Sequence, residues 1–453
     1  MPPSTPPPAQ LFKEGLALHT AGKLAEAKVL YERILTADPH HFDATHMLGV
    51  LALVSRHYGP AVSLLKRATT LKPQSPDAFY NLGLALDGAG NAADAISAYN
   101  TALALHPTHA KALNNRSKSE RSLGLIEASL ASASRALDID PNYSEAQLNT
   151  SMALLMLGRF DEGWPLYESR WQSRANSMAS RTFAQPLWLG KEPLSGKRIL
   201  IHAEQGLGDN IQMARYVPLL AQRGATVIIE VARPLAKLMQ SLAGVSAIVP
   251  RGSPLPDFDL HCPVMSLPYA FGTTLETIPT AVPYLSSTAA LRAQWSARLG
   301  NIQRPRIGLM WSGGDNPLMP NRSLALSHFA DLITNLPFDW ISLQKDIRES
   351  DRPALAALPV LRHFGDEQDG LHDAAAICEL VDLVITVDTS IAHLAGALGR
   401  PTWVLLPYVA DWRWLMHRKD SPWYPTARLF RQTSDGDWGS VLKPMQNLLP
   451  LWV

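Results

Sequence analysis

The sequence is poor in cysteine: Cys262 and Cys378 are the only two among 453 residues. Two cysteines so far apart provide neither a disulfide framework nor the cluster of thiolates that a structural metal site needs. We therefore interpret both as small, buried apolar residues of a protein in a reducing compartment.

The sequence also lacks a long hydrophobic run and an excess of charge. No apolar stretch reaches the ~20 residues that span a bilayer, and MPPSTPPPAQ at the start lacks the basic and apolar regions of a signal peptide. A formal net charge of +1 gives no general attraction to nucleic acid or to a membrane surface. These absences predict a cytoplasmic protein, with a position at the inner face of the membrane as the alternative.

Length and composition are those of a globular protein. A chain of 453 residues has room for two or three domains, and 46% apolar with 18% charged residues supplies ample core. Residues 1–8 are rich in proline and are expected to form a disordered leader.

Proline recurs at a regular interval through the first third of the chain, at Pro39, Pro73, Pro107 and Pro141. The interval of 34 residues is typical of the tetratricopeptide repeat. Glycine and alanine keep the same interval, because they let paired helices approach closely, whereas proline ends the second helix. The sequence therefore predicts an α-helical tetratricopeptide solenoid of about four to five units over residues 9–171.

Repeat arrays of this kind bind protein partners in a concave groove, so we expect a protein partner there. The fourth unit is weaker, with Ser117 and Ser129 at the small positions. Four asparagines on the first helices of the units are candidates to bond a bound peptide, or they are solvated surface residues: Asn81, Asn114, Asn115 and Asn149.

Beyond Trp171 the repeat interval disappears. Residues 172–194 read as a linker rich in Ser, Arg and Pro, and a strand–turn–helix pattern then starts twice, over residues 195–300 and 301–453. Such a pattern predicts two α/β halves with parallel sheets. The helical tail is expected to cross back to the first half. The predicted strands are 198–202, 226–231, 307–311, 340–343, 383–387 and 403–406, and the tail is 438–449.

The segment LVITVDTSIAHLAGALGRPTWVLLP, residues 383–407, contains a strand, a polar turn and a small-residue helix that Gly399 closes. Polar groups here lie where open α/β sheets bind ligands, because helix N–H groups and the helix dipole favour an anion such as phosphate. Ser390 suits the N-cap, and His393 lies in the first turn. An ordinary capped βαβ crossover is the alternative.

This segment, Asp-Thr-Ser-x-x-His-Leu-Ala, resembles the nucleotide-sugar motif of the ADP-heptose:lipopolysaccharide heptosyltransferases, which are two-domain GT-B enzymes. The resemblance implies a two-half GT-B (double Rossmann-like) module whose second half binds the donor. By the same resemblance Asp388, Thr389, Ser390 and His393 contact the donor, although Ser390 stands where the family has glycine. GT-B enzymes commonly hold the diphosphate with helix ends and basic side chains, which implies no metal and no cofactor beyond the nucleotide sugar.

The turn after the first predicted strand contains Gly206 and Gly208, which suit a tight corner or a close approach to a ligand. Asp209 follows at the start of a helix and resembles the Gly-Asp aspartate proposed as the base of heptosyltransferases. The alternative is an N-cap aspartate. His202 and Glu204 in the same turn are the other candidates for the base.

Two cations are candidates for the departing diphosphate. Arg322 and Lys345 each follow a strand and a turn of the second half; a guanidinium would grip a diphosphate bidentately, whereas an ammonium acts as a point charge. Either could instead be a solvated surface cation. Aromatic residues between Tyr408 and Tyr424 could stack on a base or sugar, or form core beneath a long loop.

With these segments, almost the whole chain resembles bacterial proteins that join tetratricopeptide repeats to a heptosyltransferase-like module. The resemblance implies a metal-independent, inverting glycosyltransferase that transfers a sugar from a nucleotide-diphosphate sugar to a protein or glycan acceptor, with the repeats recruiting the acceptor. One alternative is a non-catalytic tetratricopeptide scaffold with a degenerate GT-B module. Another is a lipopolysaccharide heptosyltransferase with an added repeat domain.

Overall fold

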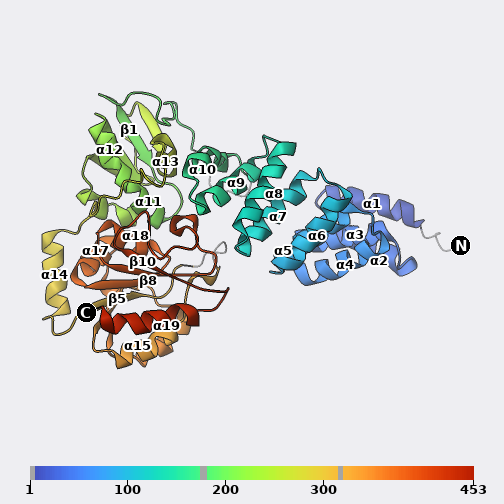
Figure 1. Cartoon of the computed structure of the whole chain (residues 1–453). Helices are drawn as coiled ribbons and strands as arrows, with labels where there is room; N and C mark the ends of the chain where they lie inside the picture. The colour runs from blue at the N-terminus through green and yellow to red at the C-terminus, as the bar shows by residue number, and fades with distance from the viewer. Residues whose placement is uncertain (1–5, 174–180, 315–319, 453) are drawn as a thin grey trace. The chain divides into compact units, whose positions relative to one another are not determined.

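The computed structural model describes residues 6–173, 181–314 and 320–452, which form two compact units (Figure 1). The first unit runs to Ala153 and includes Gln172 and Ser173, and the second comprises Leu154–Trp171 and the described residues from Arg181 onward. Most of the leader predicted for residues 1–8, and residues 174–180 of the predicted linker, lie outside the described residues.

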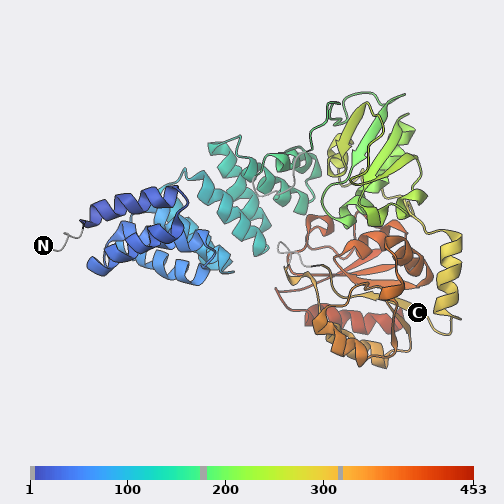
Figure 2. The ribbon, with the colours of Figure 1, turned by 180° about the vertical axis from the view of Figure 1, so that it is seen from behind.

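The first unit is a run of paired helices, as the tetratricopeptide interval predicts. Each pair packs on the next, and Figure 2 shows the pairs in succession. Pro39, Pro73 and Pro107 each follow the second helix of a pair. The helices are α1 (Pro8–Thr20), α2 (Leu24–Ala37), α3 (Phe42–Val54), α4 (Tyr58–Leu71), α5 (Pro76–Gly88), α6 (Ala92–Leu105), α7 (Ala110–Ser122), α8 (Ile126–Ile139) and α9 (Ser144–Met156).

Glycine permits the close approach within a pair. A Cβ at Gly83 would lie 2.4 Å from the ring of Tyr99, so only glycine fits there without displacing the tyrosine. In the weaker fourth unit, Ser129 Oγ instead donates to the carbonyl of Ser117 at 2.7 Å. This bond satisfies the buried hydroxyl of Ser129 and connects the two helices, whereas Ser117 Oγ has no hydrogen-bond partner among the described residues.

A second 34-residue series ends the first helix of each pair. Gly22, Gly90, Gly124 and Gly158 all have positive φ, and Arg56 occupies the same left-handed position with φ of 58°. Glycine adopts this conformation without the steric cost that a side chain brings. This series was available in the sequence and strengthens the repeat assignment.

The asparagines of the repeats bond to the neighbouring repeat. Asn149 Nδ2 donates to Asn114 Oδ1 at 2.8 Å, and both side chains are buried. Asn81 bonds His46 at 2.9 Å, and Asn115 Nδ2 donates to Tyr80 Oη at 3.1 Å. These side chains therefore hold adjacent repeats in register, a role that neither of the two sequence interpretations anticipated.

The second unit contains two parallel sheets, of four strands in the order β3-β2-β1-β4 and of six strands in the order β10-β9-β8-β5-β6-β7. The six predicted strands are all present, with bounds within one residue of those expected. The strands are β1 (Arg198–His202), β2 (Thr226–Val231), β3 (Val245–Pro250), β4 (Leu260–Pro263), β5 (Arg306–Met310), β6 (Asp339–Ser342), β7 (Leu361–His363), β8 (Leu383–Val387), β9 (Thr402–Leu406) and β10 (Ala427–Arg431).

Helices pack on the six-stranded sheet. α19 (Gly439–Leu448) and α15 (Ala330–Asn335) share a core with the strands, and Figure 2 shows both below the sheet. The tail helix α19 therefore stays with the second sheet and does not cross back as expected, because Met445 is buried in that sheet's core. None of the helices in the described part of the chain combines the length and apolar character that a membrane span requires.

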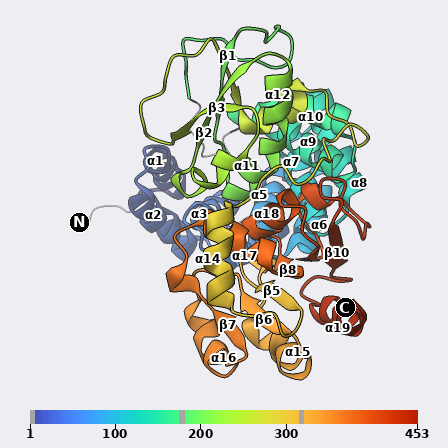
Figure 3. The ribbon, with the colours of Figure 1, turned by 90° about the vertical axis from the view of Figure 1, so that its left-hand side faces the viewer.

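Packing places three boundaries differently from the sequence prediction. α10 (Phe160–Tyr167) and η1 (Glu168–Trp171) belong to the α/β unit rather than to the repeats. Leu187, in the predicted linker, pairs with His261 of β4. α14 (Ala289–Leu299) lies along α17 (Leu371–Leu380) of the second half, as Figure 3 shows, and Trp295 Nε1 donates to Asp373 at 2.7 Å.

Candidate functional site

The turn between β8 and α18 (Ser390–Ala397) is a capped helix start at the carboxyl end of a central strand. Thr389, not Ser390, is the N-cap: its backbone is extended, and its Oγ1 accepts from Ile391 N at 3.2 Å. Ser390 already lies in the helix. The sequence could not separate adjacent Thr and Ser, because both side chains cap well and only the backbone conformation decides.

Asp388 is a buried carboxyl group at the end of β8. Burial, together with the nearby Asp411 carboxylate, raises its pKa to about 6, while Trp414, Arg413 and Arg322 offset part of that rise. Asp388 can therefore gain or lose a proton near neutral pH, which suits general acid–base chemistry as well as binding.

His393 is buried in the first turn of α18. Its Nδ1 lies 2.9 Å from Tyr424 Oη, and its ring stacks on Trp414 at 5.5 Å between centroids. Burial, followed by the charges of Arg413 and Arg215, lowers its pKa well below the usual range. His393 is therefore a neutral hydrogen-bonding group here and supplies no positive charge for a phosphate.

The two predicted cations occupy different surroundings. Arg322 lies beside the end of β8, where its guanidinium donates to the Asp388 carbonyl at 3.4 Å and to the Gly314 carbonyl at 2.8 Å. Lys345, in the loop after β6, is exposed. β5 separates β6 from β8, so the strand order brings Arg322 rather than Lys345 to the Asp388 turn.

The corresponding turn of the first sheet runs from β1 to α11 (Leu207–Met213). Gly206 is the N-cap, and its N–H donates to Asp209 Oδ2 at 2.6 Å. Asp209 is thus the third residue of the helix, reaching back to the cap, and not the N-cap considered from the sequence. Burial raises its pKa, and the charge of Arg413 and the Gly206 N–H offset part of the rise.

The two helix starts meet. α11 packs on α18, and a Cβ added to Gly208 would lie 2.6 Å from His393 Cδ2 and 3.4 Å from the Cα of Ser390. Gly208 is therefore required for this contact rather than for backbone flexibility. Residues from the carboxyl ends of both parallel sheets thereby gather at one place.

Arg413, to which sequence reasoning gave no role, connects the two turns. Its guanidinium bonds Asp209 Oδ1, Gln212 Oε1 at 2.8 Å and Asp411 Oδ1 at 2.7 Å. The side chain is buried. An arginine between two aromatic residues after β9 was the available signal, but nothing local in the sequence indicates which carboxylate it meets.

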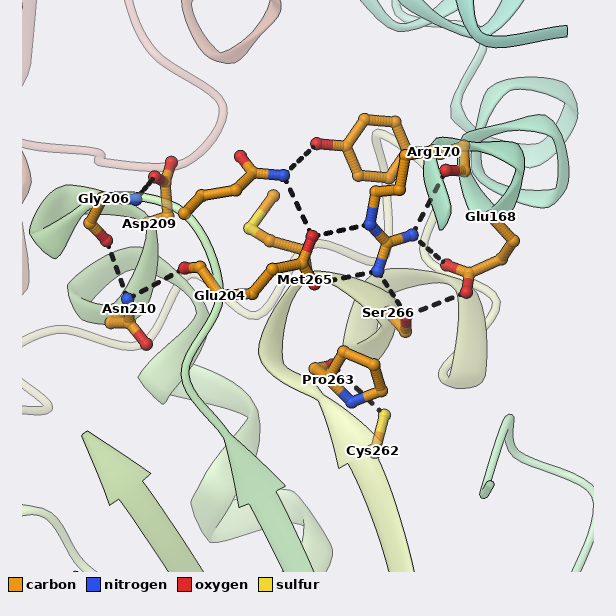
Figure 4. Close-up of polar contacts among 12 residues, drawn as sticks. Glu168, Arg170, Glu204, Gly206, Asp209, Asn210, Cys262, Pro263, Met265 and Ser266 are labelled. Carbon is orange, nitrogen blue, oxygen red and sulfur yellow. Dashed lines mark hydrogen bonds and ion pairs between the residues drawn. The ribbon is translucent and has the colours of Figure 1, made fainter. Parts of the chain in front are cut away.

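Glu204 is committed to a structural ion pair. Arg170 of η1 grips both its carboxylate oxygens, at 2.6 and 2.9 Å, and both side chains are buried (Figure 4). Arg170 also bonds Glu168 at 2.7 Å and Ser266 Oγ at 2.7 Å. A carboxylate held this way is a poor candidate for the base, and sequence reasoning missed Arg170 because it precedes the predicted module.

His202, the other candidate for the base, is buried on β1. Burial first, then the nearby His261 and arginines, lowers its pKa to about 3, and its Nε2 lies 3.3 Å from His261 Nδ1. Its other ring nitrogen has no hydrogen-bond partner among the described residues. Such a histidine stays neutral and accepts a proton poorly.

Four of the five aromatic residues between positions 408 and 424 form core, whereas Tyr408 is half-buried. Trp412, Trp414, Trp423 and Tyr424 are each at most 1% exposed, so the core interpretation holds and their faces are not free to stack on a ligand. Trp412 packs edge-on against Trp164 of α10 at 5.1 Å between centroids.

Among the described residues, no group of three or more His, Cys, Asp and Glu side chains is placed to hold a metal ion. Both cysteines are buried and free. Three Asp-x-Asp triplets occur in the sequence. In each, one aspartate side chain accepts a hydrogen bond from a backbone N–H: Asp140 from Asn142, Asp259 from Arg198 and Asp437 from Ser440.

Comparison with known proteins identifies the repeats. The tetratricopeptide repeat family model matches residues 12–76, 46–110 and 80–144. The first unit therefore consists of tetratricopeptide repeats, which form surfaces for protein partners. Among the solved structures that resemble part of this chain are MamA and YrrB. MamA has 24% identity and a TM-score of 0.33, covering 34% of this chain and 91% of that chain. YrrB, a TPR protein with an unusual peptide-binding site, has 17% identity and a TM-score of 0.33, covering 37% and 87%.

A curated relative extends beyond the repeats. Protein FlbA of Caulobacter vibrioides is 29% identical over 309 residues, which are 63% of this chain and 51% of that protein. The chain thus spans about half the length of that relative. A match over 63% of the chain is longer than the repeats, so the likeness includes at least part of the α/β unit.

Proposed function

We propose that the α/β unit is an inverting, metal-independent glycosyltransferase of the GT-B type, which transfers a sugar from a nucleotide-diphosphate sugar to a protein or glycan acceptor. The tetratricopeptide repeats recruit that acceptor. One observation supports this most directly: the polar turns after β1 and β8 lie against each other, with Arg413 bonding Asp209 and acting on Asp388. Ligands of parallel α/β sheets bind at such strand ends.

In the proposed reaction Asp209 takes the proton from the acceptor hydroxyl. The acceptor oxygen then attacks the anomeric carbon on the side opposite the diphosphate, the bond from that carbon to the diphosphate oxygen breaks, and the configuration inverts. The departing diphosphate carries the negative charge, which Arg322 and the N–H groups at the start of α18 offset.

Arg413 controls when Asp209 is available. Both Asp209 oxygens accept hydrogen bonds, one from Arg413 and one from Gly206 N–H, so both are engaged within the protein while Arg413 stays on Asp209. A diphosphate is a strong competitor for a guanidinium. Donor binding therefore draws Arg413 away and frees Asp209 as base.

The alternative function is a scaffold whose α/β unit has lost turnover. The same Asp209–Arg413 pair supports it, because a pair that never opens leaves no base. Ser390 in place of the family's glycine also fits this alternative, since it adds bulk beside the helix start. Both functions predict partner binding by the repeats, so ligand binding by the α/β unit separates them.

The first experiment measures thermal stability against ADP-, UDP-, GDP-, dTDP- and CMP-linked sugars. A ligand at about 100 times its Kd adds about 2.7 kcal/mol, a rise of several degrees for a unit of this size. We expect one nucleotide family to raise the midpoint and Arg322→Ala to abolish the rise. Arg352→Ala is the control, because it removes an exposed positive charge of the same half.

The second measurement is release of the nucleoside diphosphate in the presence of candidate acceptors. Asp209→Asn should abolish turnover and keep the donor-induced rise in midpoint, because it removes the base and not the phosphate contacts. If no nucleotide sugar raises the midpoint of the wild-type protein, the scaffold is the correct function.

A further inference from the structure

The turn that contains Asp209 is restrained by a segment that belongs to neither of the two sheets. α10 and η1 together, residues 160–171, form what we term the α10–η1 segment, which follows the repeats and packs in the α/β unit. Its Arg170 binds both carboxylate oxygens of Glu204, at the first position of the turn, and Ser266 after β4 (Figure 4). One buried guanidinium thereby connects the segment to two strand ends of the first sheet.

A second contact restrains the middle of the same turn. Gln205 has φ of 57°, a left-handed conformation that is uncommon for a residue with a side chain. Its Nε2 donates to Tyr167 Oη of α10 at 2.6 Å and to Glu204 Oε1 at 3.1 Å. Residues held in such backbone regions persist when surrounding contacts determine them, and here those contacts come from the segment.

The segment also contacts the other side of the Asp209–Arg413 pair. Trp164 packs on Trp412, the residue before Arg413, and Phe160 packs on Trp423 at 5.8 Å between centroids. The Arg170 guanidinium itself lies over the ring of Tyr167 at 4.7 Å. The α10–η1 segment therefore contacts residues near Asp209 in the chain as well as the residue next to Arg413.

We infer that Arg170 is a positioning residue for Asp209: through Glu204 it sets the turn from which Asp209 faces Arg413. The inference rests on the proposed function only in treating Asp209 as the base. A buried bidentate ion pair defines direction as well as distance, because the planar guanidinium matches the carboxylate in one orientation. A lysine keeps the charge and loses that orientation.

The test is amide hydrogen exchange of the full-length protein with Arg170→Lys. We expect exchange in residues 203–210 to become about tenfold faster, with β5, β8 and the repeats unchanged, because the hydrogen-bond partners given above for Arg170 lie in the turn, after β4 and in its own segment. Arg159→Lys is the matched control: Arg159, the residue just before the segment, also binds a glutamate bidentately, Glu162, but both side chains are half exposed. It should leave exchange in the turn unchanged.

Tyr167→Phe provides a milder variant that keeps the packing of the ring. It removes one of the two acceptors for Gln205 Nε2, so exchange in residues 203–206 should quicken by about threefold while the melting midpoint stays near that of the wild type. Unchanged exchange in the turn for both variants, or a uniform increase across both sheets with Arg170→Lys, would overturn the inference.

A kinetic measurement separates positioning from general weakening. With the donor identified, Arg170→Lys should lower kcat about tenfold or more and leave the donor KM within about twofold, because Arg322 and the N–H groups at the start of α18 stay in place for the diphosphate while the base is misplaced. Loss expressed mainly in the donor KM would contradict positioning. If the protein transfers no sugar, the exchange experiment still tests Arg170, so the two proposals fail separately.

Discussion

Burial sets the protonation of individual residues at the candidate site. It raises the pKa of Asp388 and Asp209 and lowers the pKa of His393 and His202. Both histidines are therefore neutral at physiological pH, and arginines supply the positive charge. Resemblance to a motif identifies which residues are present, whereas their charge depends on how deeply the fold buries them.

The raised pKa of Asp388 predicts a pH dependence of stability. The folded pKa of about 6 exceeds the unfolded value near 4, so the folded state binds more protons between these values and stability falls as pH rises through them. Wild type should lose roughly 1–2 kcal/mol relative to Asp388→Asn between about pH 5 and about pH 8, because asparagine does not ionise. Urea unfolding at both pH values measures the difference. An unchanged difference would show that the pKa of Asp388 is not raised.

Among the elements, the contact between α11 and α18 decides whether the two α/β halves present one site. Gly208 permits this contact, because the space that a side chain would take there is occupied by atoms of His393 and Ser390. The strand orders of the two sheets place both helices at carboxyl strand ends. Helix starts from separate sheets can therefore act on one ligand.

Gly208→Ala should force these helices apart. Its methyl group would lie 2.6 Å from His393 Cδ2, and overpacking of this kind destabilises by about 1–3 kcal/mol. Gly314→Ala is the control, because its Cβ would have no heavy atom of the described residues within 4 Å. We expect denaturant unfolding to show the loss for Gly208→Ala alone. Equal stability of the two variants would mean that α11 and α18 are not packed as described.

For the whole molecule, the boundary between repeats and α/β unit lies near residue 154. Phe160 and Trp164 are buried in the α/β unit, and Arg170 compensates the buried charge of Glu204. Sequence periodicity extended the repeats to residue 171 because α10 continues the helix-pair pattern. The last helix of that pattern, α10, packs in the following α/β unit, and terminal repeats often differ from the others in this way.

Two fragments test this boundary. A fragment that starts at Leu154 should unfold cooperatively with native-like near-ultraviolet circular dichroism, because it retains the α10–η1 segment. A fragment that starts at Gln172 leaves Glu204 buried without Arg170, a loss of about 3–5 kcal/mol, besides the lost aromatic packing. It should melt at a clearly lower temperature or lack a cooperative transition. Identical melting of the two fragments would place the boundary at residue 171 after all.

Local sequence patterns predicted the elements well and the contacts between elements poorly. The strands 198–202, 226–231 and 383–387 were predicted to the residue, since apolar runs followed by turn residues depend on neighbours in the chain. The N-cap of α18 was misplaced by one residue, because Thr389 and Ser390 cap equally well. The roles of Asp209 and Glu204 could not be separated, because that required knowing which arginine reaches each.

The sequence by itself determined the tetratricopeptide repeats, the parallel strands and the polar residues that follow them, because each depends on an interval or a run of adjacent residues. Only the tertiary structure decided that Arg413 meets Asp209 and that Arg170 meets Glu204. Arg413 lies 204 positions from Asp209 along the chain, and Arg170 lies 34 positions from Glu204. The packing of whole elements brings the two members of each pair together. Ion pairs between residues so far apart leave no periodic pattern in the sequence. The helices and strands that carry the charged residues do leave such a pattern.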